Sequence, residues 1–113
     1  MNKHILLAMK WLDDKYSVSK EELEENKRAA EAVAYVAVYA AEAYAAAEAY
    51  ATAEAYAAEA YATAESAADA TAQAAEAYAA EVKTYAEAAD YWVDKYFKES
   101  GEDKNEYLKE LIR

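Results

Sequence analysis

The sequence predicts an all-α protein whose long alanine-, tyrosine- and glutamate-rich helices pack as an antiparallel bundle or hairpin, with short helices at both termini. Three observations lead to this prediction. The 113 residues include no proline and a single glycine, so little in the chain breaks a helix. Alanine, the strongest helix former, dominates the middle of the chain. β-Branched residues are rare and never alternate with polar ones, as they do in half-buried strands. We expect one domain over residues 1–113.

The first helix is expected over about residues 2–16. Its large apolar residues recur at spacings of three and four, which is the period of an amphipathic helix. They are Ile5, Met9, Leu12 and Tyr16. The rest of the chain has few large aliphatic residues, and alanine brings little apolar area. The twelve tyrosines are therefore expected to supply most of the buried surface.

A second helix is expected to start at Lys20. Ser19 and Glu22 have the spacing of a capping box, in which each side chain accepts a hydrogen bond from the backbone amide of the other residue. Val18 and Leu23 occupy the two positions of a hydrophobic staple. Together these four residues mark the beginning of a helix.

The helical tract that begins there has no clear stop before Gly101, so it is expected to cover about residues 20–99. A single helix of this length would be about 120 Å long, far longer than ordinary helices. We expect it to fold back at a break within residues 62–77, where tyrosine is absent and polar residues appear. A capping-box spacing that starts at Asp103 predicts a short last helix over about 104–113.

The tract repeats approximately every 11 residues, so it keeps its faces along a nearly straight helix. Alanines form a seam flanked by tyrosines, and most acidic residues lie on the opposite half. We interpret the seam as a helix-packing surface. Two tyrosines point instead to the acidic side, where core packing does not explain them. The predicted binding residues are these two tyrosines and six acidic residues: Tyr44, Tyr91, Glu48, Glu54, Glu59, Glu65, Asp69 and Glu76.

The net charge is −11, and between Ala29 and Val82 there are eight glutamates, one aspartate and no lysine or arginine. This balance argues against nucleic acid and anionic membranes as partners, because both attract clusters of basic residues. It favours a protein partner with a basic patch. The longest apolar run, Ala32 to Ala41, is about half the roughly 20 residues that span a membrane. We expect a soluble, cytoplasmic protein.

No catalytic, metal or cofactor site is expected. The chain has no cysteine, which excludes disulfides and thiolate metal sites. His4 is the single histidine, and its place near the terminus predicts a solvated side chain. No nucleophile–histidine–acid set and no glycine-rich phosphate loop can be assembled. The chain is therefore expected to act by binding, as a homo-oligomer.

The whole chain resembles a loose group of small alanine- and tyrosine-rich helical proteins encoded by tailed bacteriophages. The resemblance rests on the alanine–tyrosine tract and on the segments that flank it, residues 8–12, 17–23, 91–97 and 100–104. It implies a phage protein that works in the cytoplasm of a bacterial host cell. The group has no established activity, so the resemblance assigns no role to any residue.

Three functions are compatible with these observations. The leading hypothesis is a phage accessory protein that binds and inhibits a host defence protein through an acidic helical surface. The second is a sponge that sequesters a small nucleotide between tyrosines at subunit interfaces. Its phosphate contacts would have to come from Lys10, Lys15, Lys83 and Lys95. The third is a structural coiled-coil spacer.

Overall fold

The computed structural model describes residues 1–43 and 48–112, with the backbone alone for residues 40–43, 48–57 and 79. Within these ranges the chain forms helices and no strand, which confirms the predicted all-α class. The helices are α1 (Lys3–Asp13), α2 (Lys20–Ala43), α3 (Glu48–Glu76), α4 (Ala79–Ser100) and α5 (Lys104–Leu111).

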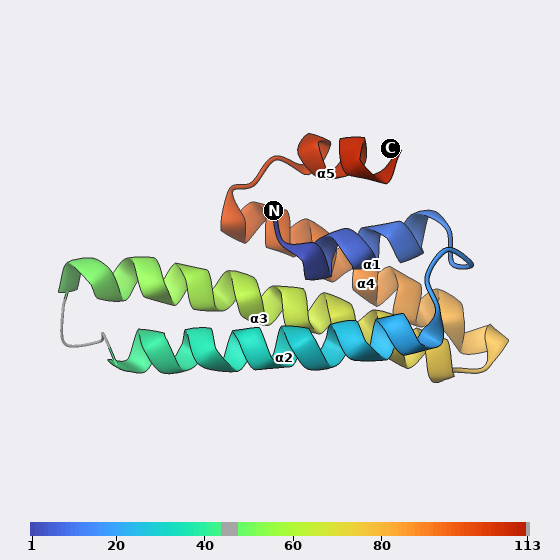
Figure 1. Cartoon of the computed structure of the whole chain (residues 1–113), viewed down its shortest axis with the longest axis horizontal. Helices are drawn as coiled ribbons and strands as arrows, with labels where there is room; N and C mark the ends of the chain where they lie inside the picture. Colours follow the sequence, from blue (N-terminus) through green and yellow to red (C-terminus); the bar gives the residue numbers. More distant parts are fainter. Residues whose placement is uncertain (44–47, 113) are drawn as a thin grey trace.

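The three long helices pack antiparallel, with α3 between α2 and α4 (Figure 1). The short helix α1 packs against all three of them, and α5 packs on α1. This is the predicted antiparallel bundle with short helices at both termini. The longest dimension of the molecule is 47 Å, because the tract folds back instead of extending as a rod of about 120 Å.

Local signals set the start of α2 as predicted. The backbone amide of Glu22 donates to Ser19 Oγ at 3.2 Å, and the amide of Ser19 donates to Glu22 Oε1 at 3.4 Å. Val18 and Leu23 are both buried in one cluster, as a hydrophobic staple requires. The capping box therefore begins the helix at Lys20.

The end of α4 and the start of α5 also follow the sequence. Gly101 has a φ of 73°, the left-handed conformation that favours glycine, and its amide donates to the carbonyl of Phe97. Asp103 then caps α5 by accepting a hydrogen bond of 2.9 Å from the amide of Asn105. Gly101 thus ends the tract where the sequence indicated.

The tract divides at two places. One lies between Ala43 and Glu48, where no break was predicted. The other lies at Ala77 and Tyr78, at the far edge of the predicted interval 62–77. Most of that interval is continuous helix. Its serine and threonine hydroxyls donate hydrogen bonds to carbonyls within α3 and do not replace the backbone hydrogen bonds of the helix. Ser66 Oγ, for example, donates to the carbonyl of Ala62 one turn earlier.

Helix α1 is shorter than predicted and ends at Asp13. Tyr16, expected on its core face, is 99% exposed. A local turn ends the helix, since Ser17 Oγ donates to the carbonyl of Asp14 at 2.6 Å and Asp14 Oδ1 accepts from the amide of Tyr16. These bonds offer the backbone an alternative to another helical turn.

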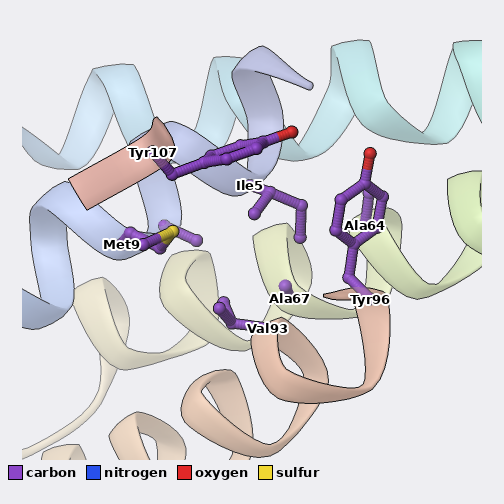
Figure 2. Close-up of a cluster of buried hydrophobic side chains, with 8 residues drawn as sticks. Ile5, Met9, Ala64, Ala67, Val93, Tyr96 and Tyr107 are labelled. Carbon is purple, nitrogen blue, oxygen red and sulfur yellow. The ribbon is translucent and has the colours of Figure 1, made fainter. Parts of the chain in front are cut away.

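The core joins the large side chains of α1 to the alanines of α3 and α4. Figure 2 shows the first cluster, which contains Ile5, Ala8, Met9, Ala64, Ala67, Val93, Tyr96 and Tyr107. A second cluster contains Trp11, Val18, Leu23, Ala70, Ala74 and Ala89. The prediction that tyrosine supplies most of the buried surface is wrong for the tyrosines whose side chains are described. Among these, only Tyr96 and Tyr107 are buried, and side chains of α1 cover the alanines of α3 and α4 instead.

Candidate functional site

Residues 32–39 of α2 have apolar or aromatic side chains on all sides of the helix. They include no charged residue, and a helix that is apolar all round is normally buried on all sides. Here the buried stripe is narrow, with Ala30 and Ala34 at 1% and 3% exposure. We call the large side chains left in solvent the α2 outer patch. It consists of Val33, Tyr35, Val36, Val38 and Tyr39, which are 38–71% exposed.

Two tyrosines form the ridge of this patch. The rings of Tyr35 and Tyr39 lie one helical turn apart with centroids 6.3 Å apart and planes inclined by 29°. The two rings stack on each other while both remain largely exposed. Tyrosine has few rotatable bonds, so it offers contact area at a low entropic cost.

An open hollow of about 600 Å³ adjoins the patch. Val33 of α2 lines it together with Ala60 and Tyr61 of α3. The start of α1 and the end of α4 complete its wall through Met1, Asn2, Lys3, His4, Tyr96, Glu99, Ser100 and Glu102. The hollow therefore marks the place where α1 and α4 stop covering the α2–α3 pair.

His4 lies in the wall of the hollow and is buried, so the prediction of a solvated histidine is wrong. Its Nδ1 lies 2.8 Å from Asn26 Oδ1, and Asn26 Nδ2 donates to the carbonyl of His4. These two bonds join the start of α1 to α2. The histidine thus has a structural role in positioning α1 beside the hollow.

Glu102 connects three segments on the other side of the hollow. Its carboxylate accepts hydrogen bonds from the phenols of Tyr96 and Tyr107, and Tyr107 also accepts one from the amide of Asn2. Burial, followed by the hydrogen bond to Glu102, raises the pKa of both tyrosines above the usual value near 10. Both phenols are therefore protonated donors at neutral pH.

Three of the predicted acidic residues lie beside basic residues of α2. Asp69 pairs with Lys27 at 3.2 Å, and Glu76 lies 3.9 Å from Lys20. The bond to Asp69 raises the pKa of Lys27 above its usual value. Burial, together with nearby carboxylates, raises the pKa of Glu65. These acids are therefore partly engaged within the molecule.

Glu59 and Tyr91 do not join them on one surface. Glu59 is exposed and lines the separate groove between α3 and α4, beside Lys95. Tyr91 is 58% exposed on α4, with its ring 5.0 Å from that of Trp92. Glu48 and Glu54 belong to α3, but their side chains lie outside the described residues, as does the whole of Tyr44.

The α2 outer patch is the feature that the residue pattern did not lead us to predict. Its signal was the apolar run that begins at Ala32, which is too short for a membrane span and too apolar for a helix with one solvent face. Across residues 1–43 and 48–112, no helix combines the length and apolarity needed to cross a bilayer. No group of three potential metal ligands occurs in the same part of the chain.

Comparison with known proteins identifies no relative of this chain. No protein family, curated protein or solved structure matches this chain. Its function is therefore inferred from the chemistry of its own surface.

Proposed function

We propose that this chain is a non-enzymatic protein-binding module that docks through the α2 outer patch. The observation that carries the proposal is the exposure of five large apolar side chains on one short stretch of helix. Clustered apolar side chains in solvent are typical of interaction sites, and tyrosine is among the residues that dominate binding energy there. The stacked pair Tyr35 and Tyr39 would be the anchor of the interface.

The charge around the patch favours a basic partner. The segment from Ala29 to Val82 has no lysine or arginine, and Glu31, two residues before Val33, is exposed. An acidic rim attracts a basic rim and accelerates association, while the apolar centre supplies most of the affinity. Binding should therefore weaken in high salt.

We further propose that the protein is a bacteriophage accessory protein whose target is a host protein, such as a component of a defence system. The support is the resemblance of the flanking segments 8–12, 17–23 and 91–97 to small phage proteins. Inhibition would follow from occlusion, since a chain that only binds can still block the basic surface that it covers.

The geometry favours protein binding over a nucleotide sponge. Within one chain, Tyr35 and Tyr39 stack on each other, so a base would have to stack on the outer face of the pair, at a contact with a second subunit. Two of the lysines considered for phosphate contacts have partners within the molecule. Lys15 lies over the ring of Trp11, and Lys95 pairs with Glu99 at 3.6 Å.

Capture of the partner from bacterial lysate tests this proposal. The tagged full chain would be compared with the double variant Tyr35→Ser/Tyr39→Ser and with the control Tyr78→Ser/Tyr91→Ser. All four tyrosines are more than half exposed, so both variants should retain the fold, which circular dichroism checks. We expect mass spectrometry to find a basic protein that is retained at low salt, lost at high salt and lost with the first variant only. Equal capture by all three chains would refute the proposal, as would no capture at low salt.

A further inference from the structure

The second core cluster opens to the surface at one end of the bundle. A hollow of about 430 Å³ lies there, within the size range of small-molecule pockets. The end of α1, the start of α2, the end of α3 and the start of α4 meet around it (Figure 1). Its apolar wall consists of residues of that cluster and their neighbours: Trp11, Val18, Leu23, Ala74, Ala75 and Val82. Because Ala75 and Val82 are only half-buried, this part of the core remains in contact with water.

Two lysines stand at the rim of this hollow, and none of its described lining residues is acidic. Lys15 precedes α2 and Lys20 is its first residue, and both are exposed. By contrast, Glu99 lines both the hollow beside the α2 outer patch and the groove between α3 and α4. An apolar wall with ammonium groups at its rim is suited to a ligand that has an apolar body and an anionic head.

We propose that this hollow binds a free medium-chain alkyl carboxylate. The alkyl chain lies against Trp11, Val18 and Val82, and the carboxylate lies between the ammonium groups of Lys15 and Lys20. Burial of the chain removes apolar surface from water on both the ligand and the open core, and the two lysines fix the orientation of the ligand. This site is separate from the α2 outer patch, so the proposal adds a small-molecule ligand to a chain that also binds protein.

Neither lysine is held in a strong ion pair. Lys20 lies 3.9 Å from Glu76, and both side chains are more than half exposed, so water competes with this contact. Lys15 Nζ lies 5.3 Å from the centre of the Trp11 ring. An ammonium group has three donors, so Lys15 can keep the aromatic contact while it donates to a carboxylate. The net charge of −11 opposes a bound anion only weakly, because salt screens charges beyond about 8 Å at physiological ionic strength.

The wall favours an alkyl body over a nucleobase. The polar edges of a base need hydrogen-bond partners when they are buried. Beyond the two lysines, the side chains that line the hollow offer such groups only at Trp11 and Tyr16, and Tyr16 is 99% exposed. An alkyl chain needs no partner of this kind and gains from burial against the aliphatic wall.

Isothermal titration calorimetry of the full chain with decanoate tests the proposal. Butyrate has the same head with almost no chain, and decylammonium has the same chain with the opposite charge. We expect decanoate to bind with its helical circular dichroism signal intact, and neither control to bind measurably. Failure of decanoate to bind, equal binding of decylammonium, or loss of the helical signal at the concentration where decanoate binds would overturn the proposal.

Variants of the lysines test the position of the carboxylate. Lys15→Gln/Lys20→Gln should weaken decanoate binding by roughly tenfold or more, because it removes both charged donors. The matched control is Lys98→Gln/Lys104→Gln, which changes the net charge equally at two exposed lysines of α4 and α5. All four lysines are exposed, so both variants should retain the fold. Equal weakening by the two variants would show a general charge effect and refute the site.

Two further measurements locate the ligand. Trp92→Phe leaves Trp11 as the single tryptophan, and decanoate should change its fluorescence emission. Tyr35→Ser/Tyr39→Ser alters the α2 outer patch and should leave decanoate binding unchanged. Unchanged Trp11 emission, or loss of binding with the tyrosine variant, would place the ligand elsewhere and overturn the proposal. Protein capture and decanoate binding depend on different residues, so either proposal can fail while the other stands.

Discussion

The phenol of Tyr107 donates a hydrogen bond of 2.6 Å to Glu102 and accepts one of 2.6 Å from the backbone amide of Asn2. One hydroxyl thus joins α5, the segment between α4 and α5, and the start of α1. We predict that Tyr107→Phe lowers the free energy of unfolding by about 1–3 kcal/mol, because it leaves part-buried polar groups without their partner. Urea denaturation measures the loss. Tyr91→Phe, on an exposed ring, is the control and should change little.

Alkaline pH should destabilise the fold through the same residues. Burial raises the pKa of Tyr96 and Tyr107 in the folded chain above the value near 10 of an unfolded tyrosine. Their contribution to stability is therefore complete below pH 10 and is lost as the pH rises toward their folded pKa. Phenolate absorbance and circular dichroism would be followed together as the pH is raised. Ionisation of Tyr96 and Tyr107 should coincide with loss of helical circular dichroism, and earlier ionisation would contradict this.

The carboxylate of Glu65 should be slightly unfavourable at neutral pH. Burial and the neighbouring carboxylates of Glu31 and Asp69 raise its pKa above the usual 4.5, so the folded chain favours the protonated form. That contribution is present in acid and lost as the pH rises through the folded pKa. Glu65→Gln should therefore stabilise the protein at pH 7, by no more than about 0.5 kcal/mol. The gain should vanish in acid, and a gain that persists there would contradict the electrostatic cause.

The buried pair of His4 and Asn26 should contribute more to the stability of the fold than its position near a terminus suggests. Asn26→Ala removes the acceptor 2.8 Å from His4 Nδ1 and the donor to the His4 carbonyl. We expect a loss of about 1–3 kcal/mol in thermal or urea unfolding, because a buried polar group is left unsatisfied. Asn105→Ala, at an exposed position, is the control. Equal stability of the two variants would show that the pair is not a constraint on α1.

Helix ends could be predicted where a side chain or backbone conformation determines them locally. Ser19 and Glu22 cap α2, and Gly101 adopts the left-handed conformation that ends α4. The end of α2 at Ala43 and the start of α3 at Glu48 have no such signal, because neither glycine nor proline occurs near them.

The exposure of individual tyrosines could not be predicted from the repeat. Tyr39 and Tyr96 were both placed on flanks of one alanine seam, yet Tyr39 is 66% exposed and Tyr96 is buried. We placed the seam by assuming one helical period along the whole tract. The interruption at Ala77 and Tyr78 means that residues before and after it no longer share a helix face. The packing of α2 on α3 also could not be predicted from the repeat. It brings Lys27 and Lys20 of α2 to Asp69 and Glu76, so these two acidic residues are paired within the chain.

The most direct test of the central claim is amide hydrogen exchange of the full chain with and without the basic partner captured from lysate, read by mass spectrometry. If the outer half of α2 is a docking surface, residues 32–39 should exchange more slowly in the complex, because docking suppresses local opening of that helix. Residues 89–97 of α4 should not change. Protection that spreads evenly over the chain, or that appears in α4 and not in α2, would contradict the assignment of the binding surface.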